Sequence, residues 1–250
     1  MKRLIVVLAA LSLLVACNGK KNEPAPQVCP EGAVDLGIVM TRADGTTYKL
    51  FWAKYNLSAS GLCSKPEDYG DFYAWGETEP KSDYSWAEYK WCQGTNTTLT
   101  KYNTSSSYGP VDPVTGTTDQ MLVLQRGDES AFATVDDAAR AKLGGKWRMP
   151  TDAEWKALRT QCEWSWTTEN GIAGRLVVSR TNGNRIFLPA AGSLSQYNER
   201  IWGGSKGFYW SSSLYEERPD NARLFTFEEG GVTQVYTTRE SGHSIRPVSE

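Results

Sequence analysis

The chain has 250 residues, of which 40% are apolar and 22% charged, a composition typical of a folded protein with one large or two small domains. Its formal net charge of −2 provides no basic field for nucleic acid, so we expect no nucleic-acid partner. Ten tryptophans, twelve tyrosines and many short alternating runs favour a fold rich in strands and loops over a helical bundle.

The first sixteen residues are typical of an export signal. Lys2 and Arg3 precede an apolar run, residues 4–16, that is too short to span a bilayer. The run leads into Leu14-Val15-Ala16-Cys17, which resembles a bacterial lipobox, so we expect cleavage before Cys17 and acylation of that cysteine. More than one acyl chain would anchor the protein stably in a membrane. The sequence therefore predicts a signal peptide at 1–16, a lipidated cysteine and Pro-rich tether at 17–30, and one folded domain at 31–250.

The other cysteines are candidates for disulfides, because export leads to an oxidising compartment. Four cysteines allow three pairings, and the expectation is none, one or two bridges. The cysteines concerned are Cys29, Cys63, Cys92 and Cys162. There is no Cys-x-x-Cys spacing and His243 is the only histidine, so we expect no metal site and no cofactor.

Alternating apolar residues and turn signals predict three hairpins and a last short strand. Asp44-Gly45, Asn182-Gly183 and Gly230-Gly231 supply the turns. The expected strands are residues 34–40 with 46–55, 176–179 with 185–188, 222–227 with 232–237, and 244–248.

Two helices are expected in the middle of the chain. Residues 135–143 carry Asp136 and Asp137 in the first turn and end at Gly144-Gly145. A half-buried strand at Trp147–Met149 then stops at Pro150, and Thr151 with Glu154 forms the capping box of the second helix. The fold class that these elements predict is α+β, with two helices packed on a mostly antiparallel sheet.

Residues 69–91 contain eight aromatic side chains interleaved with glycine and carboxylates. Such a cluster can stack against sugars. Alternatively, each ring can bury a large area and brace long loops against a small sheet. The sequence leaves both interpretations open.

Five motifs occur together and in order, and they are similar to the Fibrobacter succinogenes major paralogous domain, which is abundant in lipoproteins of the Bacteroidetes. The resemblance covers residues 33–248 and extends to the formylglycine-generating-enzyme and C-type-lectin-like group. It implies a C-type-lectin-like (sulfatase-modifying-factor-like) fold with two helices beside a twisted sheet and long irregular loops. The motifs are Tyr69–Thr78, Gly144–Thr151, Phe187–Gly192, Tyr209–Ser213 and Ile245–Val248.

The enzymes of that group use a cysteine pair near the C-terminus, whereas no cysteine follows Cys162 here. We therefore expect no catalytic residues and a non-catalytic binding module for a glycan or protein. The lipobox together with the resemblance implies a lipid-anchored protein of the cell envelope, in the outer membrane, facing either the surface or the periplasm. In lectin-like domains the ligand face is built by loops near the last strands, which here gives Tyr215, Glu216, Arg218, Asn221, Arg223, Arg239 and Glu240 as candidate ligand-binding residues.

Three alternatives remain open. The protein could be a target of a diversity-generating retroelement, which would be a special case of the binding module. It could be a structural component of a surface complex or fimbria-like organelle, with the aromatics of residues 69–91 as a protein interface. An oxidase related to the formylglycine-generating enzymes is the third alternative, and it would require a reactive thiol pair.

Overall fold

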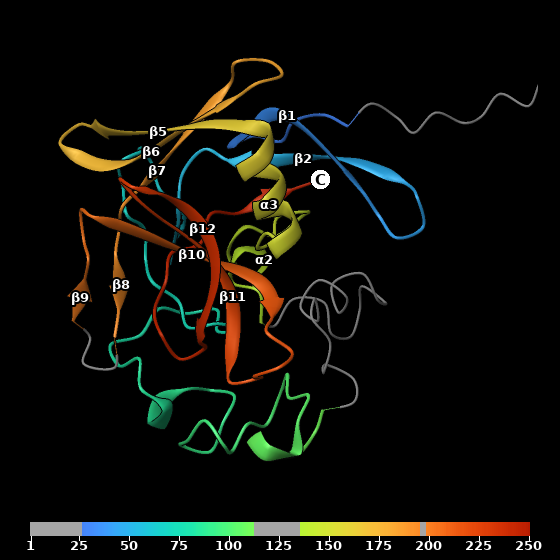
Figure 1. The fold of residues 1–250 in the computed structure, drawn as a ribbon, viewed down its shortest axis with the longest axis vertical. Helices are drawn as coiled ribbons and strands as arrows, with labels where there is room; N and C mark the ends of the chain where they lie inside the picture. The colour runs from blue at the N-terminus through green and yellow to red at the C-terminus, as the bar shows by residue number, and fades with distance from the viewer. Residues whose placement is uncertain (1–26, 113–135, 196–198) are drawn as a thin grey trace, which may run out of the picture.

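The computed structural model describes residues 27–112, 136–195 and 199–250, and most of its regular structure is strand (Figure 1). The expected signal peptide, Cys17 and most of the tether lie outside the described residues. The helices of the described part are α2 (Ala138–Leu143) and α3 (Asp152–Gln161), with short 3₁₀ turns at Trp86–Glu88 and Ser106–Tyr108. No helix in the three described ranges is long and apolar enough to cross a membrane.

The described strands form five small sheets, in which every strand pair is antiparallel. Three sheets have three strands each, in the orders β1-β2-β13, β5-β6-β7 and β10-β11-β12, and the pairs β3-β4 and β8-β9 form the other two. The strands are β1 (Ala33–Thr41), β2 (Thr47–Ala53), β3 (Leu57–Ser58), β4 (Gly61–Leu62), β5 (Cys162–Glu169), β6 (Ile172–Ser179), β7 (Arg185–Pro189), β8 (Ser193–Leu194), β9 (Arg200–Ile201), β10 (Lys206–Leu214), β11 (Asn221–Glu228), β12 (Gly231–Thr238) and β13 (Val248–Ser249).

Helix α3 joins the three larger sheets. It packs against β1, β5 and all three strands of the β10-β11-β12 sheet, and Figure 1 shows it between these layers. Its Trp155 is fully buried, with its ring centroid 4.7 Å from that of Trp52 and stacked 4.8 Å from that of Phe225. One side chain therefore contacts the β1-β2-β13 sheet and the β10-β11-β12 sheet together, and the main hydrophobic core forms around it.

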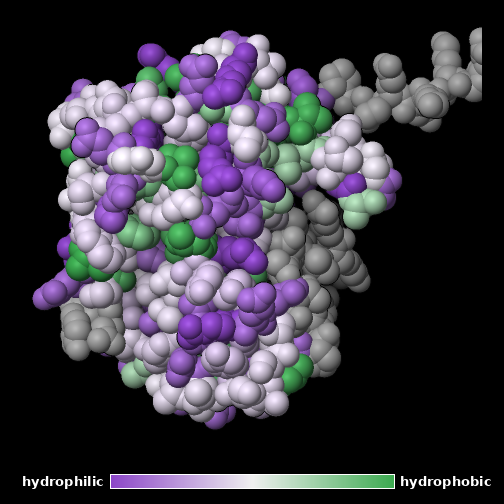
Figure 2. Space-filling view, in the orientation of Figure 1, coloured by the Kyte–Doolittle hydropathy of each residue, from purple (hydrophilic) through white to green (hydrophobic). Residues whose placement is uncertain are grey.

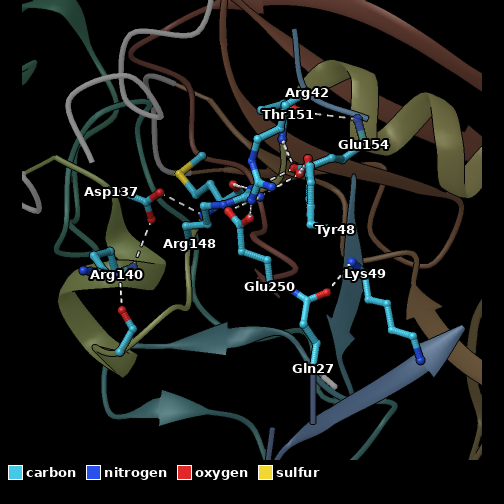
Figure 3. A network of polar contacts seen from close by, with 12 residues as sticks. Gln27, Arg42, Tyr48, Lys49, Asp137, Arg140, Arg148, Thr151, Glu154 and Glu250 are labelled. Atoms are coloured by element: carbon cyan, nitrogen blue, oxygen red, sulfur yellow. Dashed lines mark hydrogen bonds and ion pairs between the residues drawn. The ribbon is translucent and has the colours of Figure 1, made fainter. Parts of the chain in front are cut away.

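The start of α3 is fixed by a capping box, as the sequence predicts. The Thr151 hydroxyl accepts a hydrogen bond from the Glu154 N–H, and the Glu154 carboxylate accepts one from the Thr151 N–H. The same carboxylate forms a bidentate ion pair with Arg148, at 2.7 and 2.8 Å, and accepts a 2.8 Å hydrogen bond from the Tyr48 hydroxyl (Figure 3). The capping residue is thus also the centre of a buried ionic network, in which Glu250 also lies close to Arg148.

The expectation of a C-type-lectin-like, two-helix α+β fold is wrong. The described residues form several small sheets, one substantial helix and short turns. The first expected helix is short because Asp137 is its N-cap, accepting from the Arg140 N–H, and Asp136 instead binds Lys101 and Tyr102. Of the two carboxylates that the sequence places in a first helical turn, Asp137 caps the helix and Asp136 binds the neighbouring loop of Lys101 and Tyr102.

The three predicted hairpins are confirmed, as β1-β2, β6-β7 and β11-β12. Two other strands differ from expectation. Strand β5 follows α3 directly, with Cys162 as the C-cap, and pairs with β6 over its whole length. The expected last strand at 244–248 is reduced to β13, because residues 244–247 bond to several separate segments. Around Trp147–Met149 only Arg148 forms a bridge, to Val248, and Arg148 is more buried than Trp147.

The aromatic residues of 69–91 mostly brace the loop that contains them. Five of the eight are buried, and three donate hydrogen bonds to carbonyls of the same loop: Tyr84 to Phe72, Tyr89 to Trp75, and Trp91 to Gly76. Rings that satisfy their own loop's backbone have structural work that accounts for them.

Candidate functional site

The seven candidate ligand-binding residues do not form one surface. Arg239 is fully buried, with its guanidinium 5.4 Å from the ring centroids of both Trp75 and Tyr89. It donates to the carbonyls of Lys101 and Tyr102, and burial lowers its pKa. Arg239 therefore joins the aromatic loop to the last hairpin and is not available to a ligand.

Asn221 and Glu240 are also buried. Asn221 donates a 2.7 Å hydrogen bond to Asp220, and Glu240 accepts one from the Thr238 hydroxyl. The second carboxylate oxygen of Glu240 has no hydrogen-bond partner in the described part of the chain. Burial raises the pKa of Glu240 to about 7, and the charge of Asp220 acts in the same direction.

We expect Glu240→Gln to stabilise the protein at high pH. Glu240 has a pKa of about 7 when folded and about 4.3 when unfolded, so the folded state binds more protons between these values and stability falls as pH rises. The glutamine variant should be more stable than the parent by about 3–4 kcal/mol at pH 8 and nearly equally stable at pH 4. Urea unfolding at both pH values measures this, and an equal effect at pH 4 and pH 8 would contradict it.

The remaining four candidates lie at an exposed end of the β10-β11-β12 sheet. The rings of Tyr215 and Tyr236 stack with centroids 4.0 Å apart, and the Arg223 guanidinium lies 5.1 Å from the Tyr215 centroid. The Tyr215 hydroxyl donates to Glu217, and this bond raises its pKa to about 12. We call Tyr215, Tyr236 and Arg223 the tyrosine platform; sequence reasoning missed Tyr236.

Glu216 and Arg218 border this platform and are exposed. The Glu216 carbonyl accepts from the Thr104 hydroxyl, and Arg218 lies 3.5 Å from the buried Asp220 carboxylate. The first contact ties the Tyr215 loop to the loop of Thr104, and the second lies within the Tyr215 loop. The groups of the tyrosine platform contact one another, through the stacked Tyr215 and Tyr236 rings and the Arg223 guanidinium beside Tyr215.

A groove of about 440 Å³ lies at the opposite end of the same sheet. Its floor is one row across three paired strands, Phe208 on β10, Thr226 on β11 and Thr233 on β12. Trp202 stands at its edge, with its ring centroid 5.4 Å from that of Phe208. We call this the Trp202 groove, and sequence reasoning missed it; its other lining residues are Lys206, Phe227, Glu228, Gly230, Gly231 and Val232.

Trp202 is held in an exposed position by its loop. All ten tryptophans lie within the described residues, and only Trp202 has half of its surface exposed, at 50%. Its φ of 58° is in the left-handed region, which is uncommon for a bulky side chain and tends to occur at functional sites. The Trp202 carbonyl accepts from the N–H groups of Ser205 and Lys206, which fixes the turn.

The rim of the groove carries both charges. Lys206 and Glu228 face each other across β10 and β11 and form a 2.7 Å ion pair. Next to them, Gly207 leaves room for the Phe227 ring, since a Cβ on Gly207 would lie 2.2 Å from it. The groove therefore combines an aromatic edge, an apolar wall, two threonine hydroxyls and a paired cation and anion.

The buried titratable groups near this sheet do not have the form of a catalytic centre. His243 is stacked on Phe208 and lies tilted against Trp210. Neither ring nitrogen has a hydrogen-bond partner among the described residues, and burial lowers the pKa of His243 to about 3. The thiols that were possible disulfide partners, Cys29, Cys63, Cys92 and Cys162, are all free, and burial raises the pKa of each. Within the described residues, no three of the His, Cys, Asp and Glu side chains gather where they could share a metal ion.

Residues 164–248 match the model of DUF8237, a domain of unknown function. No curated protein matches the chain, and no solved structure matches it. The matched stretch runs from β5 to β13 and includes both ends of the β10-β11-β12 sheet. The part of the chain that forms the Trp202 groove and the tyrosine platform is thus similar to the DUF8237 family.

Proposed function

We propose that this chain is a lipid-anchored protein of the bacterial cell envelope whose domain binds a carbohydrate, without transforming it, in the Trp202 groove. The observation that carries the proposal is the half-exposed Trp202 ring beside a groove with hydrogen-bonding groups. An exposed indole offers a flat apolar surface on which the C–H face of a sugar ring packs well.

The polar groups of the groove suit sugar hydroxyls. Lys206 supplies N–H donors and Glu228 supplies acceptor oxygens, while the ion pair keeps the rim near neutral. The hydroxyls of Thr226 and Thr233 lie on the floor. A sugar presents donors and acceptors together with apolar C–H groups, so this mixture fits a carbohydrate better than a charged ligand.

The surroundings favour binding over catalysis. A buried neutral His243 and thiols with raised pKa supply no activated base or nucleophile. Figure 2 shows the hydrophobic residues of one face as small separate islands among hydrophilic ones, which suits a polar ligand. The envelope location rests on the lipobox-like Leu14–Cys17 and the Pro-rich tether.

Binding should depend on the Trp202 ring. On an array of bacterial and host oligosaccharides, we expect the detergent-solubilised full chain to bind a defined set of glycans. Trp202→Ala should lower affinity at least about tenfold, which corresponds to the roughly 1.4 kcal/mol expected for one aromatic contact. Trp202→Phe should retain part of the binding, because it keeps an aromatic face.

Trp147→Ala is the matched control, since Trp147 is half-buried and lines a separate cleft with Leu143 and Glu250. It should leave glycan binding unchanged. Equal binding by the parent and Trp202→Ala would contradict the proposal, as would a parent chain that binds no glycan.

A further inference from the structure

Among the described residues, no strand pairs with the outer edge of β12. This strand is the last of the β10-β11-β12 sheet and pairs with β11 from Gly231 to Thr238 without a register shift. In an antiparallel pair every second residue directs its N–H and C=O away from the partner strand. Within the described part of the chain, the only backbone bond from β12 beyond this pairing is the one that the Thr238 carbonyl accepts from Ser241.

The other sheet edges carry features that block pairing. Strand β1 has Asp35 and a register shift, β5 has Glu163 and Glu169, and β7 ends in Pro189. The outer edge of β10 is bridged at Gly207 and Tyr209. Charges, proline, bulges and cover are the usual protections of an edge strand.

Within the described residues, strand β12 has no charge, proline or bulge, and its contacts with α3 include the Gln234 side chain, which donates to Asp152. The sequence of the strand is Gly-Val-Thr-Gln-Val-Tyr-Thr-Thr, and none of its eight residues is buried. Val235 and Tyr236 are two of the six large apolar side chains that are exposed in the described part. Such a strand is a ready template for another strand.

We infer that two copies of this chain pair through their β12 edges, antiparallel, to form one six-stranded sheet. A second copy suits this edge because a symmetric pair sets each side chain near its own kind. Any charged residue on the strand would then lie near the same charge on the other copy and weaken the pairing. Strand β12 has no charged residue, so a second copy meets no such repulsion. A two-fold axis also closes the assembly at a dimer.

Symmetry restricts the register. A two-fold axis that makes two strands antiparallel is perpendicular to the sheet, so each face stays on the same side. Because successive residues alternate between faces, paired residues must both be odd-numbered or both even-numbered. Among these registers, the two that pair most of β12 set Val235 or Gln234 opposite its own copy, with cross-strand Cβ atoms about 5 Å apart.

This dimer has a consequence for the Trp202 groove. Its floor residues Phe208, Thr226 and Thr233 lie on one face of the sheet. The two-fold axis keeps both grooves on that same side, so two copies would meet one surface together. Bivalent binding raises affinity without any new contact. The dimer itself does not depend on what the groove binds.

Charge placed at the axis tests the dimer. In sedimentation equilibrium of the detergent-solubilised full chain, we expect the parent to be dimeric, and Val235→Lys or Val235→Glu alone to associate about tenfold more weakly. An equimolar mixture of the two variants should restore the dimer. A monomeric parent, a Val235→Lys variant that associates like the parent, or a mixture that stays monomeric would each overturn the inference.

Cysteine cross-linking in intact envelopes tests the register independently. Under mild oxidation, Val235→Cys or Gln234→Cys should give a disulfide-linked dimer. Thr237→Cys should not, because in both registers its own copy lies at least four residue spacings away, about 13 Å. The parent measures the background from the existing cysteines. Linkage at Thr237 as strong as at 234 or 235, or linkage at neither of those two, would overturn the inference.

Discussion

Glu154→Ala should lower the free energy of unfolding by about 3–5 kcal/mol, the usual effect of removing one partner from a buried ion pair. The variant leaves the Arg148 guanidinium buried without its bidentate partner and removes the acceptor of the Tyr48 hydroxyl (Figure 3). It also removes half of the capping box at Thr151. Urea unfolding of the parent and the variant measures the difference.

The double variant Arg148→Met, Glu154→Leu is the matched control, because it leaves no uncompensated charge. It should recover most of the lost stability. A loss of less than 1 kcal/mol in Glu154→Ala, or a double variant no more stable than the single one, would count against the ionic network as the support of α3.

The network also predicts acid sensitivity. Burial alone would raise the pKa of Glu154, but the charge and hydrogen bonds of Arg148 hold it below its ordinary value. Its stabilisation is therefore complete above the unfolded pKa of about 4.3 and declines as pH falls through the lower folded value.

Arg246→Met should lower the free energy of unfolding by about 4 kcal/mol, because each buried acceptor that it leaves unsatisfied costs about 1–3 kcal/mol. Arg246 is fully buried and donates to the carbonyls of Ala53, Lys54 and Phe187 and to the side chain of Asn56. Burial lowers its pKa to about 10. One side chain thus joins the end of β2 to β7.

Arg246→Lys separates charge from geometry, since lysine keeps the charge but not the planar set of donors. It should recover less than half of the loss in the methionine variant, as measured by guanidinium unfolding. Full recovery by lysine would show that the charge alone matters, and that result would contradict the bonding role assigned here.

Local signals in the sequence were sufficient where the cause is local. The capping box at Thr151 and Glu154 is predictable because its partners are three residues apart. The turn at Gly230-Gly231 fixes the β11-β12 hairpin for the same reason. The buried network around Arg148 was not predictable in this way. Its third member, Tyr48, also binds Glu154 but is distant from both residues in the sequence.

The arrangement of the sheets and the site depends on tertiary contacts. Arg239 and Glu240 follow a hairpin strand and have the composition of a solvated end, but the aromatic loop of residues 69–91 covers them. Trp202 was missed because a single residue in a Gly-rich turn has no periodicity. The one available signal was a large aromatic residue directly before Gly203-Gly204, where a turn usually carries polar residues.

The most direct test of the Trp202 groove as a glycan site is ¹⁹F NMR of the full chain labelled with 5-fluorotryptophan. Its ten tryptophan resonances are assigned by single substitutions to phenylalanine and followed while the best-binding glycan from the array is added. We predict that the Trp202 resonance shifts with saturation while that of Trp147 stays fixed. A Trp202 resonance that does not move, with shifts at Trp86 or Trp91 instead, would place the ligand on the aromatic loop and contradict this account.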